Sequence, residues 1–486
     1  MRGPSIGFDV VLSLALVGFT LFVWIPHYGG QIAQLCSAHP HCRHFSLHHD
    51  TGDSQWDSFH RSAHLLGVYF LINCVTKLCC ARNHQIPLRI FFGVVFIVIL
   101  HGYQAVIILL IAYGGFLLAQ YFKFSPPHLK AVVVWSYAAL VLTMKESYRW
   151  QRQFPFVQIL FGRRYGGIYS WHLASNFLVL RMLSFQIDSS QTNEQLLNTY
   201  SLSNYFAYVL YWPLYMAGPI VPYHQFIQDL VSGGESVSLS KHWIYFLRLV
   251  FSYFVMRTLS YAFPVFAIQR SRIFYSLSPP QLAVYLYLTL QMMWLKFLLI
   301  WRYFTLFARL DGVNAPENML RCVSNNYSLS MFWRGWHASF NKWITRYMYL
   351  PLGGRDNPFS LWIIFVFVAM WHDFDIKLLT WGLLNAAFHM VEIIGRIMGK
   401  SSCFEALSGC SQLTLRVIAG GIFVLMLMGV NLIGYAFGVD EFLHAIDIFS
   451  KDYYGISTMV TCFAVVCAAV RVMMAIDGPH SDRKSK

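Results

Sequence analysis

Charged side chains are scarce in this sequence. Asp, Glu, Lys and Arg make up 12% of its 486 residues, whereas 57% of the residues are hydrophobic. Soluble globular proteins carry about 25% charged residues, so this composition excludes an ordinary soluble protein. No polar connector between the apolar runs is long enough to form a separate soluble domain. We therefore expect one multi-pass membrane domain over residues 1–486.

Strand-like alternation of polar and apolar residues is absent from the apolar runs, which argues against a β-barrel. Continuous runs favour helices, because backbone groups in lipid must be satisfied within each segment. The sequence predicts an all-α, polytopic helical bundle of about 10 to 12 spans, with re-entrant helices where a run is shorter than about 20 residues. The expected spans are 7–25, 64–81, 88–101, 103–122, 131–144, 168–184, 204–222, 243–268, 281–307, 359–371, 376–395, 414–438 and 457–475.

The ten cysteines include no CxxC pair, and many of them lie in or beside apolar runs, so a disulfide framework is not expected. A disulfide between Cys36 and Cys42, which share one polar loop, remains an open alternative. The histidines of residues 39–49 match no closed metal site, so we expect no metal ion. No small-x-small cleavage pattern follows the first apolar run, which predicts a retained span.

Several function classes lack their characteristic motifs. There is no Gly-x-Ser-x-Gly elbow and no His-Glu-x-x-His, which argues against serine hydrolases and zincins. Internal repeats are not visible and the apolar runs carry few acidic residues, which argues against a secondary transporter. The net charge of +14 is explained by Lys and Arg that flank membrane spans. We therefore expect membrane lipids, and no nucleic acid, as partners.

Two tryptophan–histidine pairs lie in this apolar background, Trp336-His337 and Trp371-His372. An ionisable group is costly in lipid, so such a side chain should face a bundle interior or a wet cavity. Imidazole is also well suited to accept a proton near neutral pH. The two pairs therefore suggest proton-transfer chemistry inside the bilayer.

The first pair lies in an unusual stretch, residues 315–354, which ends with the sequence FWRGWHASFNKWITRYMYLPLGG. On a helix, His337, Asn341 and Lys342 would share one face with Arg334. An interfacial helix with an aromatic belt and snorkelling cations is the alternative.

Together with Trp-His-Asp at 371–373, this stretch resembles the membrane-bound O-acyltransferase family. The similarity is greatest to the branch of the fungal glycerol-uptake proteins, which are relatives of hedgehog acyltransferase. Leu-Arg-Met-Leu-Ser-Phe at 180–185, the segment 214–220 and the segment 378–383 resemble the same branch. The resemblance covers a motif-bearing core at about residues 165–395.

The resemblance implies acyl transfer from acyl-CoA, as co-substrate, to a hydroxyl or an amine, with no required cofactor. The near-invariant histidine of the family maps onto His372, which we expect to be the general base. The second site residue of the family maps onto His337. Asn341 and Asp373 are expected to orient the catalytic groups or stabilise the oxyanion.

Four further site residues follow from the same stretch. Arg334, Lys342 and Arg346 are expected to bind CoA phosphates, because guanidinium groups make bidentate phosphate contacts; headgroup anchoring is the alternative. A cysteine at a place similar to that of Cys322 ligates haem in hedgehog acyltransferase, so haem at Cys322 is a further hypothesis, beside a purely structural cysteine.

The expected function is O-acylation of a lipid in the endoplasmic reticulum membrane, with a lyso-glycosylphosphatidylinositol (lyso-GPI) anchor or a related lysolipid as acceptor. N-terminal palmitoylation of a secreted protein, as hedgehog acyltransferase performs it, is the first alternative. A glycerol or polyol transporter-associated protein and a catalytically dead relative are the others. Retention of both His337 and His372 favours catalysis over the last two.

Overall fold

The computed structural model describes residues 7–40, 42, 45–46, 49–80, 84–146, 167–189, 199–231, 239–357 and 359–478. Helices dominate this part of the chain, and its one strand pair, β1 (Phe45–Ser46) with β2 (His49–Asp50), is two residues long. The predicted all-α membrane fold is confirmed.

The first half of the described chain agrees only in part with the predicted apolar runs, because α2 lies largely in the predicted polar connector 27–62. Its elements are α1 (Phe8–Phe19), η1 (Thr20–Trp24), α2 (Ile25–Ala38), α3 (Ser54–Cys79), α4 (Gln85–His101), η3 (Gly102–Gln104), α5 (Ala105–Tyr121), α6 (Pro127–Lys145), α9 (His172–Asp188), α10 (Leu202–Val209), η6 (Trp212–Leu214), α11 (Tyr223–Val231) and α12 (Leu239–Ala262).

The second half contains the motif-bearing segments. Its elements are α13 (Val265–Arg270), η7 (Arg272–Ser276), α14 (Pro279–Leu310), α15 (Leu329–Gly335), α16 (Ala338–Ile344), η8 (Thr345–Tyr349), η9 (Gly354–Asp356), α17 (Ser360–His372), α18 (Ile376–Met398), α19 (Ser402–Glu405), α20 (Gly409–Asn431), η10 (Leu432–Ala436), α21 (Val439–Ser450) and α22 (Tyr453–Asp477).

Eight helical segments of the described chain are long and apolar enough to cross a membrane, fewer than the 10 to 12 spans expected. They are Phe8–Ala38, Ser54–Cys79, Gln85–Tyr121, Pro127–Lys145, Pro279–Leu310, Ile376–Met398, Gly409–Ala436 and Tyr453–Asp477. Two expected spans, 88–101 and 103–122, fall in one segment that bends at Gly102, where φ is +57°. The helix α17 has only 13 residues and is too short to cross alone.

The prediction of a continuous span at 204–222 is wrong. The helix α10 ends after eight residues, and a 3₁₀ turn containing Pro213 follows. Proline has no backbone N–H and its ring clashes with the preceding helical turn, so the α-helix cannot continue there. The apolar character of this segment reflects burial inside the protein, because residues 205–215 are all buried except Phe206.

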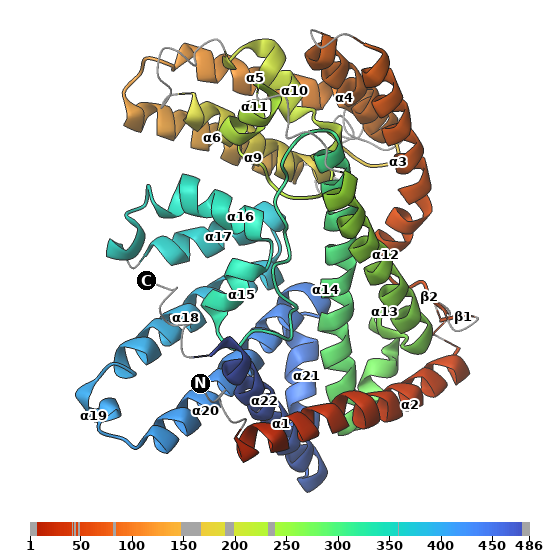
Figure 1. The fold of residues 1–486 in the computed structure, drawn as a ribbon, viewed down its shortest axis with the longest axis vertical. Helices are drawn as coiled ribbons and strands as arrows, with labels where there is room; N and C mark the ends of the chain where they lie inside the picture. Colours follow the sequence, from red (N-terminus) through yellow and green to blue (C-terminus); the bar gives the residue numbers. More distant parts are fainter. Residues whose placement is uncertain are drawn as a thin grey trace.

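The helix α14 organises the molecule (Figure 1). It runs through the centre of the view, in green, and contacts α2, α12 and α22 along its length. The motif-bearing helices α15 to α18 lie to one side of it, between an upper group formed by α5, α6 and α9 and a lower group formed by α20 to α22. The candidate site lies where these groups meet.

Candidate active site

The chain turns sharply at His337. This residue adopts φ 45° and ψ 49° and is the one non-glycine residue with positive φ in the described chain. The prediction that Arg334, His337 and Lys342 share one helix face is therefore wrong, because α15 ends before His337 and α16 begins after it. A left-handed conformation costs a non-glycine residue about 1–3 kcal/mol, and such strain concentrates at functional sites.

Neighbouring polar groups hold this turn. The Asn318 side-chain oxygen accepts hydrogen bonds from the Ser339 backbone N–H at 3.1 Å and from the Ser339 hydroxyl at 2.6 Å. The Asn318 carbonyl accepts from the Ala338 N–H at 2.9 Å. The ring of Trp301, on α14, stacks on the His337 imidazole at 4.4 Å and 19°. Both the backbone and the ring of His337 are thus fixed.

We expect Asn318→Ala to lower the turnover number by about tenfold, because losing this acceptor releases the strained turn at His337 and leaves buried donors unsatisfied, at about 1–3 kcal/mol. The measurement compares kcat and thermal stability with those of Asn204→Ala. Asn204 makes a side-chain hydrogen bond of another kind, in which its amide nitrogen donates to the Thr199 backbone carbonyl at 2.9 Å, and it lies outside the site. Wild-type kcat in Asn318→Ala would show that the turn does not need this bond.

His372 is the last residue of α17 and its ring packs among aromatic side chains. The Trp371, Tyr435 and Trp381 rings lie edge-on to it at 4.7, 5.5 and 6.3 Å. No described hydrogen bond joins its ring nitrogens to the protein. The Asp373 side chain accepts from the Phe374 backbone N–H at 2.9 Å, and the predicted orienting role of Asp373 remains a prediction.

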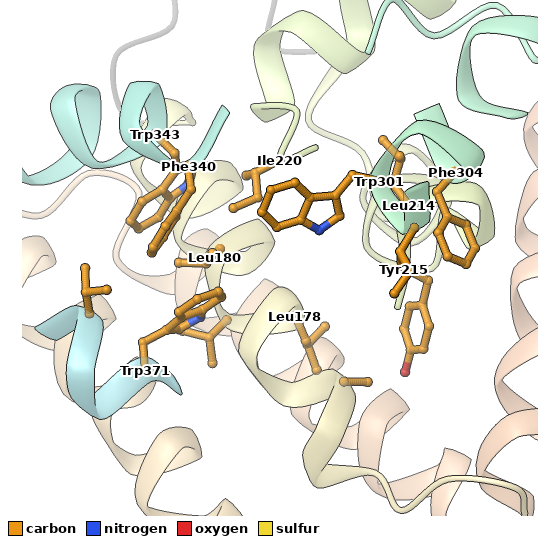
Figure 2. Packing of buried hydrophobic residues seen from close by; sticks show 14 of the residues in the cluster. Leu178, Leu180, Leu214, Tyr215, Ile220, Trp301, Phe304, Phe340, Trp343 and Trp371 are labelled. Carbon is orange, nitrogen blue, oxygen red and sulfur yellow. The ribbon is translucent and has the colours of Figure 1, made fainter. Parts of the chain in front are cut away.

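An aromatic contact joins the two histidine-bearing segments. The Phe340 ring on α16 packs on the Trp371 ring at 4.5 Å. Figure 2 shows these two rings facing each other, with Trp343 beside Phe340 and with Trp301 approaching from α14. The two predicted catalytic histidines are therefore held by one continuous packed cluster, although 35 residues separate them in the sequence.

Both histidines line a cavity of about 2790 Å³. Its walls come mainly from α14 to α18 and α20 to α22, with further lining residues on α1 and on α9, among them Asn176. The His337 side chain is buried, and its Nε2 atom has no hydrogen-bond partner. A buried polar atom without a partner is costly, so this nitrogen is available to a group that enters the cavity.

The predicted site residues divide into two groups. Arg334, Asn341 and Cys322 line the cavity together with the two histidines. Lys342, Arg346 and Asp373 lie outside its lining. The Arg346 guanidinium pairs instead with the buried Asp188 carboxylate at 3.1 Å, and the Tyr347 hydroxyl donates to the same carboxylate at 2.9 Å.

Basic side chains outnumber acidic ones on the described cavity wall. They are Arg321, Arg334, Arg355, Arg396, Lys400 and Arg416, against Glu392 alone. Arg396 pairs with Glu392, and Arg321 pairs with Asp477 at 3.3 Å. No described carboxylate pairs with Arg334, which leaves its guanidinium available to an anionic ligand.

Cys322 lies in the loop between α14 and α15, with its side chain exposed to the cavity. Haem iron would bind the thiolate form. Desolvation by the surrounding protein raises the pKa of the Cys322 thiol, which favours the neutral form. No step below uses haem, and ligation of haem by Cys322 stays a prediction to be checked by the absorption spectrum of the purified protein. Among the described residues, no cluster of three or more His, Cys, Asp or Glu could hold a metal ion.

The motifs did not reveal three residues at the site. Lys145 and Asn176 contact the end of α17, and Tyr435 contacts the His372 ring. Tyr435 lies in the π-helical turn η10. The preceding residue, Gly434, lies so close to Trp381 that a β-carbon at position 434 would be 2.6 Å from the Trp381 ring. Lys145 directly follows an expected span. In the sequence it therefore looks like an ordinary charged residue at a membrane edge, and nothing else indicates a role at the site.

Comparisons with known proteins agree with this geometry. The model of the membrane-bound O-acyltransferase family matches residues 133–408. The membrane-bound O-acyltransferase GUP1 of Saccharomyces cerevisiae is 30% identical over 471 residues, covering 88% of this chain and 82% of the relative. GUP1 of Schizosaccharomyces pombe is 29% identical, with 88% and 80% covered. The mouse protein-cysteine N-palmitoyltransferase HHAT is 27% identical over 37% of each chain.

The family match spans more than half of the sequence and includes both histidine segments and the helices α14 to α18. The chain belongs to the membrane-bound O-acyltransferase family and is an acyltransferase.

Proposed function

We propose that this protein transfers a long-chain acyl group from acyl-CoA to a hydroxyl of a lyso-GPI anchor or a related lysolipid in the endoplasmic reticulum membrane. One observation carries the proposal: two histidines from separate segments, His337 and His372, open into the same large cavity between apolar helices. A thioester with a long acyl chain needs an apolar space that excludes water, and its transfer needs a positioned base.

The chemistry assigns a role to each histidine. His372 removes the proton from the acceptor hydroxyl while the hydroxyl oxygen attacks the thioester carbonyl carbon. The unpartnered Nε2 of His337, when it carries the proton, donates to the developing oxyanion, and Asn341 can add a second donor. The C–S bond then breaks, and the protonated His372 returns its proton to the departing CoA thiolate. The ester and free CoA are the products.

The basic part of the cavity supplies a site for the donor. CoA carries a pyrophosphate and a ribose phosphate, and Arg side chains bind such groups with two hydrogen bonds. Arg334 is the strongest candidate, because it directly follows Trp333 in the motif, lines the cavity and has no described carboxylate partner. Lys342 and Arg346 lie outside the cavity lining and do not enter this proposal.

A disulfide indicates how the first candidate span is oriented in the membrane. Cys36, at the end of α2, is bonded to Cys42. Disulfides form in oxidising compartments such as the reticulum lumen, so this end of the candidate span Phe8–Ala38 would face the lumen. The other end of that span would then face the cytosol, where acyl-CoA is made available.

The relatives support a hydroxyl acceptor. The relatives that align over most of this chain are named O-acyltransferases, whereas the N-palmitoyltransferase aligns over 37% of it. N-terminal palmitoylation of a secreted protein is the second candidate function. A transporter-associated role is weaker, because the histidine pair provides catalytic groups and not a path for a polar solute.

The test is CoA release by the purified protein in detergent, with palmitoyl-CoA or longer acyl-CoAs and a lyso-GPI lipid. We expect release that requires the lipid. Release that requires an N-terminal peptide of a secreted protein instead would establish the second candidate. No release with either acceptor from a folded protein would overturn the enzyme proposal for these substrates.

We expect Arg334→Gln to raise KM for acyl-CoA by about tenfold with kcat little changed, since losing a charge-assisted contact costs about 1.5–3 kcal/mol. The measurement is KM with palmitoyl-CoA and with palmitoyl-pantetheine, which lacks the nucleotide phosphates. Only the first KM should rise. Arg270→Gln is the control, because Arg270 is exposed and lies outside the cavity. Equal effects on both donors would remove Arg334 from the phosphate site.

A further inference from the structure

The end of α17, which carries His372, is clamped from two other helices. Lys145 is the last residue of α6, and its ammonium group donates to the Trp371 carbonyl at 3.0 Å and to the His372 carbonyl at 3.1 Å. These carbonyls lie in the last turn of α17, where no further turn supplies backbone donors. A cation at this end also complements the helix dipole.

Asn176, on α9, completes the clamp. Its side-chain oxygen accepts from the Lys145 ammonium at 3.2 Å, and its side-chain nitrogen donates to the His372 carbonyl at 3.4 Å. Its backbone carbonyl accepts from the Trp371 indole N–H at 2.9 Å. The backbone at His372 is thus tied to residues 227 and 196 positions away in the sequence.

This clamp has a specific task because no described hydrogen bond orients the His372 ring. In many hydrolytic sites a carboxylate bonds to the far nitrogen of the catalytic imidazole and fixes its direction. Here the direction depends on the backbone position and on ring packing against Trp381 and Tyr435. Displacing a catalytic group by 1 Å can cost about a hundredfold in rate.

We propose, on the basis of the function proposed above, that Lys145 and Asn176 are positioning residues that set the place of His372 for proton transfer. Lys145 is buried and does not line the cavity, so it does not reach a substrate there. It acts through the two carbonyls of α17, and its loss changes the chemical step without changing substrate binding.

The test variant is Lys145→Met, which keeps the length of the side chain and removes its charge and donors. We expect kcat to fall by about a hundredfold while KM for acyl-CoA and for the acceptor stays unchanged. Lys145→Arg restores a cation with several donors and regains part of kcat. Asn176→Ala is the second variant if Lys145→Met does not fold. Because Asn176 also lines the cavity, this variant must lower kcat with KM for both substrates unchanged, and a raised KM would overturn its positioning role.

The matched control is Lys130→Met. Lys130 lies on the same helix and is also buried, but it donates to the Ser189 hydroxyl at 3.3 Å, away from α17. If burial of a lysine on α6 matters only for stability, both methionine variants will lower the melting temperature and neither will lower kcat selectively. A kcat in Lys145→Met equal to that in Lys130→Met, or a raised KM with unchanged kcat, would overturn the proposal.

A second readout does not depend on activity. Diethyl pyrocarbonate modifies accessible imidazole, and mass spectrometry reports the modification rate at His372. We expect this rate to change in Lys145→Met and to stay at the wild-type value in Lys130→Met. If the wild-type protein releases no CoA, the proposed function fails, while the modification rate still decides whether the clamp positions His372. An unchanged rate would overturn the clamp.

Discussion

His372→Ala is expected to lower acyl transfer by at least about a thousandfold, within the range that a positioned general base contributes. Without the His372 imidazole, the acceptor hydroxyl keeps its proton, because the role proposed for His337 is to donate to the oxyanion and not to accept this proton. The His372 ring contacts the Trp371, Trp381 and Tyr435 rings at this point of the cavity wall. The measurement is single-turnover CoA release at saturating acyl-CoA.

The control for this prediction is His60→Ala. The His60 ring is partly buried and lies 2.9 Å from the Tyr253 hydroxyl, outside the cavity. Loss of this histidine tests whether removing any partly buried imidazole disturbs the membrane fold. The His372→Ala protein should purify and melt like the control, since its missing ring leaves the Lys145 bonds to the backbone in place. Full activity in His372→Ala would contradict the mechanism.

The sequence predicted those parts of the fold that depend on local composition. Continuous apolar runs mark long helices such as α14 and α22, because each satisfies its own backbone groups whatever surrounds it. The prediction of a span at 204–222 was wrong because a segment buried in protein is as apolar as one buried in lipid. Only Pro213 and the neighbouring aromatic side chains distinguish the two cases, and a hydropathy average over the segment does not register these residues.

The candidate site shows a similar limit. The Trp-His pairs identified His337 and His372, since an ionisable residue stands out in an apolar run. The prediction that Arg334 and Lys342 lie on one helix face was wrong because the chain makes a left-handed turn at His337. This turn depends on Asn318 and Trp301, which lie in other segments. Lys145 and Asn176 reach α17 from α6 and α9, and no local pattern encodes such a contact.

Substitutions at His337 are expected to separate the backbone role of this residue from its chemical role. His337→Ala removes the ring but keeps the β-carbon, and with it the left-handed strain of about 1–2 kcal/mol. Glycine adopts the same conformation without strain, and asparagine tolerates it while keeping a side-chain donor. The three variants therefore differ in strain and in hydrogen bonding.

We expect His337→Ala to lose at least about a hundredfold in kcat, as for the removal of one oxyanion donor. His337→Gly should be equally inactive but melt higher than His337→Ala, because the backbone strain is relieved while the donor is still missing. His337→Asn should retain the most activity of the three. The measurements are kcat and melting temperature for all three proteins. If His337→Gly were as active as the wild type, the imidazole would serve only to shape the turn, and the oxyanion would need another donor, for which Asn341 is the cavity residue to test next.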